Sequence, residues 1–232
     1  MTASHINRSN SVAIIPARGG SERIPLKNMS DFGGKPALHR VISIAKESDI
    51  FEKIIVSTDN SIIADYAISI GVDIIRRPDK LSDNLTPIQP VIAHALSKIP
   101  DFEFACMILP TAVLLHPQRL QSAKALLSRY QELDFAIGIR RYDSPPHRAL
   151  FLDNQGNVKM EQPEMFHKRS QDLRKLYFDA GQFSFGTRTA WLSGKPSFLL
   201  RTRGIELSRI ESIDIDEPED LEFAQRLFDT IK

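Results

Sequence analysis

The stretch VAIIPARGGSERIPLKN at residues 12–28 decides the fold. Its first four residues are apolar, which is typical of a short strand covered on both faces. The rest of the stretch is polar, and it holds the adjacent glycines Gly19 and Gly20. A helix is predicted next, because Leu38, Val41 and the apolar residues after them recur at helical spacing. A strand, a glycine loop and a helix in this order predict the first unit of an open α/β sheet.

The same alternation continues along the chain. Further strands are predicted at residues 54–56, 72–75, 104–109, 135–139, 182–185 and 213–216. Amphipathic helices are predicted between most of these strands, and a last helix is expected from Pro218 onward. Strands that alternate with helices predict a doubly wound, mostly parallel sheet. We therefore expect the α/β fold class.

Residues 140–175 interrupt the alternation. They are polar, contain three prolines and carry the turn signal DNQG at residues 153–156. We interpret them as a small hairpin-like insertion that serves as a lid or as a dimer contact. The expected organisation is a flexible tail over residues 1–10 and a single domain over residues 11–232 that contains this insertion.

Composition excludes several classes of protein. The chain has 30 Lys and Arg against 29 Asp and Glu, so a general electrostatic grip on nucleic acid or anionic lipid is not expected. Its one cysteine, Cys106, excludes an internal disulfide framework and a multi-thiolate zinc site, and its apolar neighbours suggest a buried position. No apolar run is long enough to span a membrane, and we expect a cytoplasmic protein.

The loop after the first strand is the sharpest chemical feature. Ligands of open α/β sheets bind beyond the carboxyl ends of the strands, and paired glycines let backbone N–H groups approach an anion. Arg18, Arg23 and Lys27 add three cations within ten residues, which suits a triphosphate. A solvated basic loop is the alternative. No Walker A or dinucleotide fingerprint is present, which disfavours a dinucleotide-dependent oxidoreductase.

The second chemical feature is the acidic pair Asp214 and Asp216. In a strand, residues two apart point to the same face, and two adjacent carboxylates favour a cation such as Mg²⁺ between them. Asp216 is also well placed to cap the helix that starts at Pro218. The local pattern does not decide between metal binding and capping.

Together, the motifs resemble one known family. The strings IIPARGGSxRIPxKN, VSTD, RPxxLSD, RxQDL and IDID occur in that order over nearly the whole chain. They are similar to those of the CMP-sialic acid synthetases, which are nucleotidyltransferases that activate nonulosonic acids with CTP. Segments 82–96, 144–148 and 170–183 are most similar to the members of this family that act on pseudaminic acid.

The resemblance implies a Rossmann-type fold of the nucleotide-diphospho-sugar transferase kind, a homodimer and a role for most of the motif residues. The residues expected at CTP are Arg18, Gly19, Gly20, Ser21, Arg23, Lys27, Asn28, Arg77 and Ser82. Asp214 and Asp216 would hold Mg²⁺ and, with Arg18 and Lys27, would form the catalytic set. The residues expected at the acidic nine-carbon sugar, in the same or the neighbouring subunit, are Arg169, Gln171, Asp172 and Tyr177.

Two departures from the family pattern bear on function. Glu22 replaces a basic residue of the phosphate loop, so we expect it to turn outward or to reach the metal through water. Leu109 stands where sialic acid synthetases usually carry a glutamine that contacts the sugar, which favours a more deoxygenated sugar such as pseudaminic acid. Transfer to N-acetylneuraminic or legionaminic acid is the nearest alternative, and a non-catalytic nucleotide sensor is an alternative of another class.

Overall fold

A seven-stranded sheet forms the centre of the computed structural model, which describes residues 10–231. Its strands lie in the order β3-β2-β1-β4-β8-β5-β9. Their bounds are β1 (Ser11–Pro16), β2 (Lys53–Thr58), β3 (Asp73–Arg76), β4 (Phe104–Ile108), β5 (Phe135–Arg141), β8 (Tyr177–Thr187) and β9 (Thr202–Glu206). β8 is antiparallel to both of its neighbours, and the other neighbouring pairs are parallel. The expected mostly parallel sheet is confirmed.

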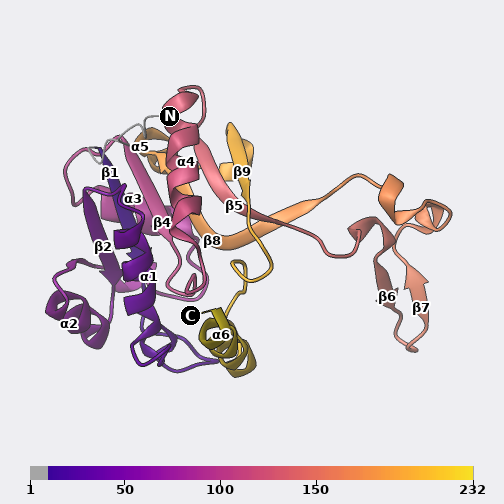
Figure 1. Ribbon diagram of the computed structural model, residues 1–232, viewed down its shortest axis with the longest axis horizontal. Helices are drawn as coiled ribbons and strands as arrows, with labels where there is room; N and C mark the ends of the chain where they lie inside the picture. Colours follow the sequence, from indigo (N-terminus) through magenta and orange to yellow (C-terminus); the bar gives the residue numbers. More distant parts are fainter. Residues whose placement is uncertain (1–9, 232) are drawn as a thin grey trace.

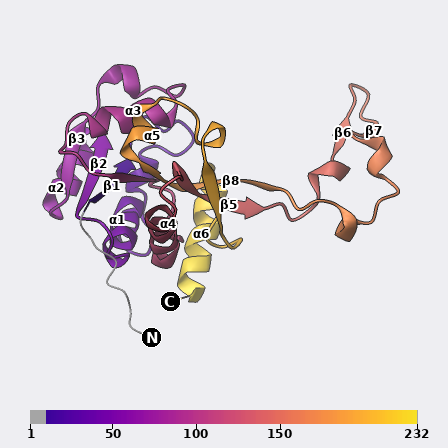
Figure 2. The same ribbon diagram turned by 90° about the horizontal axis from the view of Figure 1, so that it is seen from above.

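Helices cover both faces of this sheet (Figures 1 and 2). Alternate residues of β1 show the division, since Ala13 and Ile15 pack into one apolar cluster and Val12 and Ile14 into the other. Residues of α1 (Ala37–Glu47), α2 (Ser61–Ser69), α4 (Pro117–Arg129) and α6 (Pro218–Ile231) belong to the first cluster. Residues of α3 (Ile88–Leu96) and α5 (Arg188–Leu192) belong to the second. The predicted doubly wound arrangement is thus confirmed.

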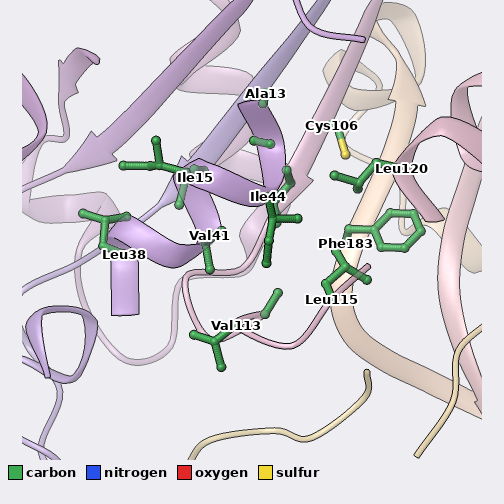
Figure 3. Packing of buried hydrophobic residues seen from close by; sticks show 14 of the residues in the cluster. Ala13, Ile15, Leu38, Val41, Ile44, Cys106, Val113, Leu115, Leu120 and Phe183 are labelled. Atoms are coloured by element: carbon green, nitrogen blue, oxygen red, sulfur yellow. The ribbon is translucent and has the colours of Figure 1, made fainter. Parts of the chain in front are cut away.

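Figure 3 shows the first cluster from close by. Ile15 of β1 lies beside Leu38 and Val41 of α1, and Cys106 of β4 lies near Leu120 of α4. The Cys106 thiol is fully buried, and this burial raises its pKa well above the ordinary value. Cys106 is therefore a small core residue, as its apolar neighbours in the sequence suggested. Within residues 10–231, no helix combines the length and apolar character needed to cross a bilayer.

Residues 142–176, which we call the arm, extend away from the sheet between β5 and β8 (Figures 1 and 2). Near its far end, β6 (Leu150–Leu152) and β7 (Val158–Met160) form an antiparallel hairpin. The DNQG segment makes the turn of this hairpin: Asp153 accepts hydrogen bonds from the Gln155 and Asn157 backbone N–H groups. The arm occupies nearly the same residues as the predicted insertion.

In the last part of the chain, one predicted strand is absent and one strand was missed. Residues 213–216 form no strand, because no neighbouring strand pairs with them, although Ile215 is buried and Asp214 is exposed as in an alternating segment. β9 was not predicted, because its sequence TRGIE has a single large apolar residue. This strand lies at the edge of the sheet and pairs with β5 alone.

Candidate active site

One cavity of about 610 Å³ lies beyond the carboxyl ends of β1 and β4. Four parts of the chain, far apart in sequence, form its wall: the loop after β1, the segment between β3 and α3, the residues after β4 and the approach to α6. The lining residues are Pro16, Arg18, Ser21, Glu22, Arg23, Lys27, Asn28, Arg77, Leu81, Asp83, Asn84, Thr86, Ile88, Val91, Leu109, Pro110, Thr111, Asp214 and Asp216. The cationic loop and the acidic pair therefore share one cavity.

The loop after β1 is held in shape by its own polar groups. Asn28 is buried, and its side-chain amide donates a hydrogen bond of 2.9 Å to the carbonyl oxygen of Arg18. This bond joins the two ends of the loop. Lys27 follows Leu26, which has the positive φ of 50°, and begins a short 3₁₀ helix. The loop thus brings Arg18, Arg23 and Lys27 to one wall of the cavity.

The acidic pair meets two of these cations. Asp216 Oδ1 lies 2.9 Å from Arg23 Nη2 and 3.2 Å from Lys27 Nζ. Lys27 Nζ also donates to the backbone carbonyl of Ile215, and Arg23 makes a second ion pair with Glu217 at 2.9 Å. Residues more than 180 positions apart are joined in this way.

The two carboxyl groups have opposite electrostatic environments. Desolvation by the surrounding protein, followed by repulsion from Asp216, raises the pKa of Asp214. Desolvation acts in the same direction on Asp216, but Lys27 and Arg23 outweigh it and lower the pKa of that group. The pair therefore holds one strongly stabilised carboxylate beside one that gains a proton more readily.

The capping role that was open for Asp216 belongs to another residue. Asp220, in the first turn of α6, accepts hydrogen bonds from the backbone N–H groups of Asp216 at 3.0 Å and Glu217 at 2.7 Å. A side chain at this helix position that reaches back to the cap residue is one half of a capping box. The Asp216 carboxylate is instead directed to Arg23 and Lys27.

Three residues expected at the nucleotide do not line the cavity as the structure describes it: Gly19, Gly20 and Ser82. The Gly19 N–H donates a hydrogen bond of 3.1 Å to Asp59, the last residue of the VSTD motif. The Ser82 hydroxyl donates to the carbonyl of Pro78 at 3.1 Å, although the residues on both sides of Ser82 line the cavity. We infer that Gly19 and Ser82 shape the loops that border the cavity.

Arg77 reaches the cavity from a buried position. Its guanidinium donates to the carbonyl of Ser57 at 2.8 Å and to the Ser57 hydroxyl at 3.4 Å. Burial lowers the pKa of Arg77. These bonds fix the direction of the guanidinium at the end of β2.

Asn84 was missed by the sequence analysis, because the RPxxLSD motif ends one residue before it. Its side-chain amide accepts a hydrogen bond from Arg18 and donates one of 2.5 Å to Glu22. Glu22 therefore binds Asn84 on the cavity wall and does not turn outward. The contact joins loops 62 residues apart, which no local sequence signal could indicate.

The residues expected at the sugar lie apart from this cavity. Arg169, Gln171 and Asp172 belong to the arm, where Arg169 Nε lies 2.8 Å from Asp172 Oδ2. Gln171 lines a separate cavity of about 190 Å³ at the arm, and Tyr177 is the exposed first residue of β8. None of the four lines the main cavity of its own chain, in the part of the chain that is described.

The acidic pair fits a magnesium ion by its donor chemistry. Residues 10–231 contain no group of three or more His, Cys, Asp or Glu side chains arranged for a metal. Mg²⁺ usually binds through one or two carboxylates together with substrate phosphates and water, so two carboxylates that share a cavity with the cationic loop are sufficient. Asp214 and Asp216 meet this requirement.

Three comparisons relate this geometry to known proteins. A pseudaminic acid cytidylyltransferase of Campylobacter jejuni is 36% identical, over 94% of this chain and 95% of its own length. A CMP-N,N'-diacetyllegionaminic acid synthase of Legionella pneumophila is 29% identical, over 94% and 96%. The solved structure of a CMP:2-keto-3-deoxy-manno-octonic acid synthetase complexed with CTP superposes with a TM-score of 0.74 over 97% of this chain and 100% of that one.

The last comparison concerns the fold, because the two sequences are only 16% identical. It matches the seven-stranded, mostly parallel sheet described above. A family model described as "Cytidylyltransferase" matches residues 12–230, which include the cationic loop and the acidic pair. The chain therefore belongs to the cytidylyltransferase family.

Proposed function

We propose that this protein converts CTP and pseudaminic acid to CMP-pseudaminic acid and pyrophosphate. The observation that carries the proposal is that Arg18, Arg23 and Lys27 of the cationic loop line the same cavity as Asp214 and Asp216. The relatives support the choice of sugar, since the Campylobacter jejuni enzyme named for pseudaminic acid matches nearly the full chain. We assign the reaction to the cytoplasm, where CTP is available.

The cationic loop binds the triphosphate in this proposal. Arg23 and Lys27 are paired with Asp216, and Arg18 is bonded to Asn84. Each of these three cations therefore exchanges a protein acceptor for a phosphate oxygen when CTP binds. Charge-assisted hydrogen bonds to phosphate are among the stronger polar contacts, which favours this exchange. Asn28 and Arg77 fix the loops on either side of the nucleotide.

Asp214 and Asp216 would hold Mg²⁺ once Arg23 and Lys27 turn to the phosphates. When bound, the ion would neutralise phosphate charge and favour ionisation of the attacking hydroxyl. The protein's own contribution is to hold two carboxylates against the phosphate loop.

The chemical step is a displacement at the α-phosphorus. The anomeric hydroxyl oxygen of the sugar forms a bond to the α-phosphorus, and the bond from that phosphorus to the bridging oxygen breaks. Pyrophosphate leaves with this oxygen, and the hydroxyl proton passes to a carboxylate of the pair or to water. Positioning and charge neutralisation supply most of the rate enhancement in such transfers.

The wall after β4 bears on the choice of sugar. Leu109, Pro110 and Thr111 line the cavity, and Leu109 is held by a backbone bond of 3.0 Å from its N–H to the carbonyl of Gln182. An apolar side chain here leaves sugar hydroxyl groups without a partner, which disfavours highly hydroxylated acids. This agrees with a deoxygenated sugar such as pseudaminic acid.

The arm supports a homodimer. In the hairpin register, Leu150 faces Met160 and Leu152 faces Val158, so the four share one face, and Leu150, Leu152 and Val158 are each more than 60% exposed. An isolated two-stranded hairpin is marginally stable in water. A second copy that covers this face would stabilise it and bring the arm residues Arg169, Gln171 and Asp172 toward a partner's cavity.

A pair of isosteric variants tests the assignment of the acidic pair. Asp216→Asn removes one charge from the cavity and weakens the pairs with Arg23 and Lys27, so we expect a slightly lower melting temperature and a fall in turnover of about a hundredfold or more. Glu219→Gln is the matched control, since Glu219 is exposed on α6 and does not line the cavity. Pyrophosphate release with CTP and Mg²⁺ measures both. If the turnover of Asp216→Asn equals that of the control, Asp216 has no role in the reaction.

A panel of sugars with CTP tests the substrate. We expect pyrophosphate release to be fastest with pseudaminic acid and slower with legionaminic, N-acetylneuraminic and deoxyoctulosonic acids. A preference for one of the other acids would change the proposed sugar substrate but not the proposed cytidylyl transfer. CTP binding without pyrophosphate release from any sugar would indicate the nucleotide sensor and refute the enzyme.

A further inference from the structure

Beyond Leu207, whose N–H donates to the carbonyl of Ile139 on β5, the segment that carries the acidic pair has no sheet partner. Residues 207–217 run from the end of β9 to the start of α6 without regular secondary structure. Strand hydrogen bonds therefore do not determine where Asp214 and Asp216 lie. Other contacts must hold these carboxylates against the phosphate loop.

The firmest of these contacts is an ion pair to α4. Glu211 is 7% exposed, and its carboxylate accepts two hydrogen bonds from Arg119, from Nε at 2.7 Å and from Nη2 at 2.9 Å. The same carboxylate accepts the backbone N–H of Ser208 at 3.0 Å. A bidentate guanidinium–carboxylate pair fixes orientation as well as distance. Arg119 thus fastens the irregular segment to the first turn of α4.

Other anchors follow along the chain, among them the Lys27 bond to the Ile215 carbonyl and the bond of the Asp216 N–H to Asp220. The side-chain amide of Gln182, on β8, donates to the carbonyl of Ile213 at 3.3 Å, and Ile215 is buried in the core. Asp214 lies between these anchors and only three residues after Glu211. Three extended residues span about 10 Å at most, so Asp214 stays close to the Glu211 anchor, and loss of that anchor leaves the segment around Asp214 held by fewer contacts.

We propose that Arg119, acting through Glu211, is a positioning residue for the acidic pair. Arg119 is not among the residues that line the main cavity within residues 10–231, so it touches neither nucleotide nor sugar there. Its role is to hold Asp214 and Asp216 where they meet a nucleotide-bound divalent ion. The inference rests on the proposed function.

The test compares two arginines that each fasten a backbone segment. Arg119→Gln removes the guanidinium from Glu211. Arg201→Gln is the matched control, because Arg201 binds Asp134 with Nε at 3.1 Å and Nη2 at 3.4 Å, also as a bidentate pair. Both Arg201 and Asp134 are absent from the main cavity wall. Both variants lose one ion pair, and only the first is expected to disturb the acidic pair.

Three measurements on the full chain distinguish positioning from stability. Amide hydrogen exchange without ligands should become faster at residues 208–217 in Arg119→Gln and remain unchanged there in the control. The affinity for Mn²⁺ in the presence of CTP, measured by electron paramagnetic resonance, should fall about tenfold in Arg119→Gln. This is the lower end of the loss in metal affinity that is usual when a residue supporting metal ligands is replaced. The kcat should fall by a similar factor, and the KM for CTP should change less than twofold.

Partial rescue provides a second variant. Arg119→Lys keeps the charge and one hydrogen bond, so its Mn²⁺ affinity should lie between those of wild type and Arg119→Gln. Wild-type Mn²⁺ affinity and exchange in a folded Arg119→Gln would overturn the proposal, as would equal losses in Arg201→Gln. If Arg119→Gln fails to fold, Arg119→Lys decides by the same measurements. Absence of pyrophosphate release from the wild type would refute the proposed function instead. Mn²⁺ binding in the presence of CTP and amide hydrogen exchange would still test the positioning role of Arg119.

Discussion

Replacing Gly19 by alanine separates the structural need for a glycine from its use in binding. A Cβ atom at Gly19 would lie 2.5 Å from Asn60 Nδ2 and 2.8 Å from Asn60 Cβ. Contacts below 3.0 Å force one of the groups to move. Asn60 cannot move freely, because its side-chain oxygen caps α2 by accepting the Ile63 N–H at 3.2 Å.

The cost follows from these contacts. Loss of the Asn60 cap destabilises by about 1 kcal/mol. Overpacking beside the backbone adds about 1–3 kcal/mol. A total of about 3 kcal/mol lowers the melting temperature of a domain of this size by about 6–12 °C. The Gly19 N–H bond to Asp59 is strained by the same shift, so CTP binding should weaken as well.

The neighbouring glycine provides the comparison. A Cβ atom at Gly20 meets nothing within 4 Å. Gly20→Ala should therefore keep or slightly raise the melting temperature, since alanine restricts the unfolded chain. If the backbone at Gly20 approaches a phosphate, the added methyl group should still raise the KM for CTP.

Thermal unfolding followed by circular dichroism, together with calorimetry of CTP binding, measures both variants. Equal melting temperatures for Gly19→Ala and Gly20→Ala would refute the packing argument. An unchanged CTP affinity in Gly20→Ala would show that this position is not in close contact with the nucleotide.

Two further predictions concern other parts of the molecule. Hydrogen bonds from Arg201 lower the pKa of Asp134, so the pair stabilises the fold above the ordinary Asp pKa of about 3.9, and this contribution is lost as the pH falls through the lower folded-state value. Asp134→Asn should lower the free energy of unfolding, measured in urea, by about 0.5 kcal/mol at pH 7, typical of an exposed pair, with the difference shrinking as the pH falls below the ordinary Asp pKa; a difference that grows in acid would contradict this sign. Leu152→Glu in the exposed hairpin should shift the protein from dimer to monomer in sedimentation, whereas Ile68→Glu on the exposed face of α2 should not. If the wild type is a monomer, or if Leu152→Glu remains a dimer, the proposal that the arm forms a dimer interface is refuted.

Much of the fold could be predicted from the sequence, because its core strands are continuous apolar runs. The strand that includes residues 12–15 and the one that includes 104–108 are buried on both faces, so their composition alone marks them. β9 could not be predicted, because an edge strand needs few apolar residues and is defined by its pairing with β5.

The cationic loop and the acidic pair were identified from their residue types and their order along the chain. Charge density in the loop and two carboxylates before a helix are local properties, and they do not depend on the rest of the fold. The same reasoning assigned residues 213–216 to a strand, because alternation of Ile and Asp predicts an extended segment whether or not a neighbour pairs with it.

Tertiary structure alone decided which groups meet. Arg23 and Lys27 pair with Asp216 across almost the whole length of the chain, Asn84 joins Arg18 to Glu22, and Arg119 binds Glu211. Such contacts arise because parallel strands bring their carboxyl ends to one edge of the sheet, wherever they occur in the sequence. Sequence thus determined which chemical groups this protein carries, and the packing of loops and of the irregular segment 207–217 at this edge of the sheet determined which of them share a cavity.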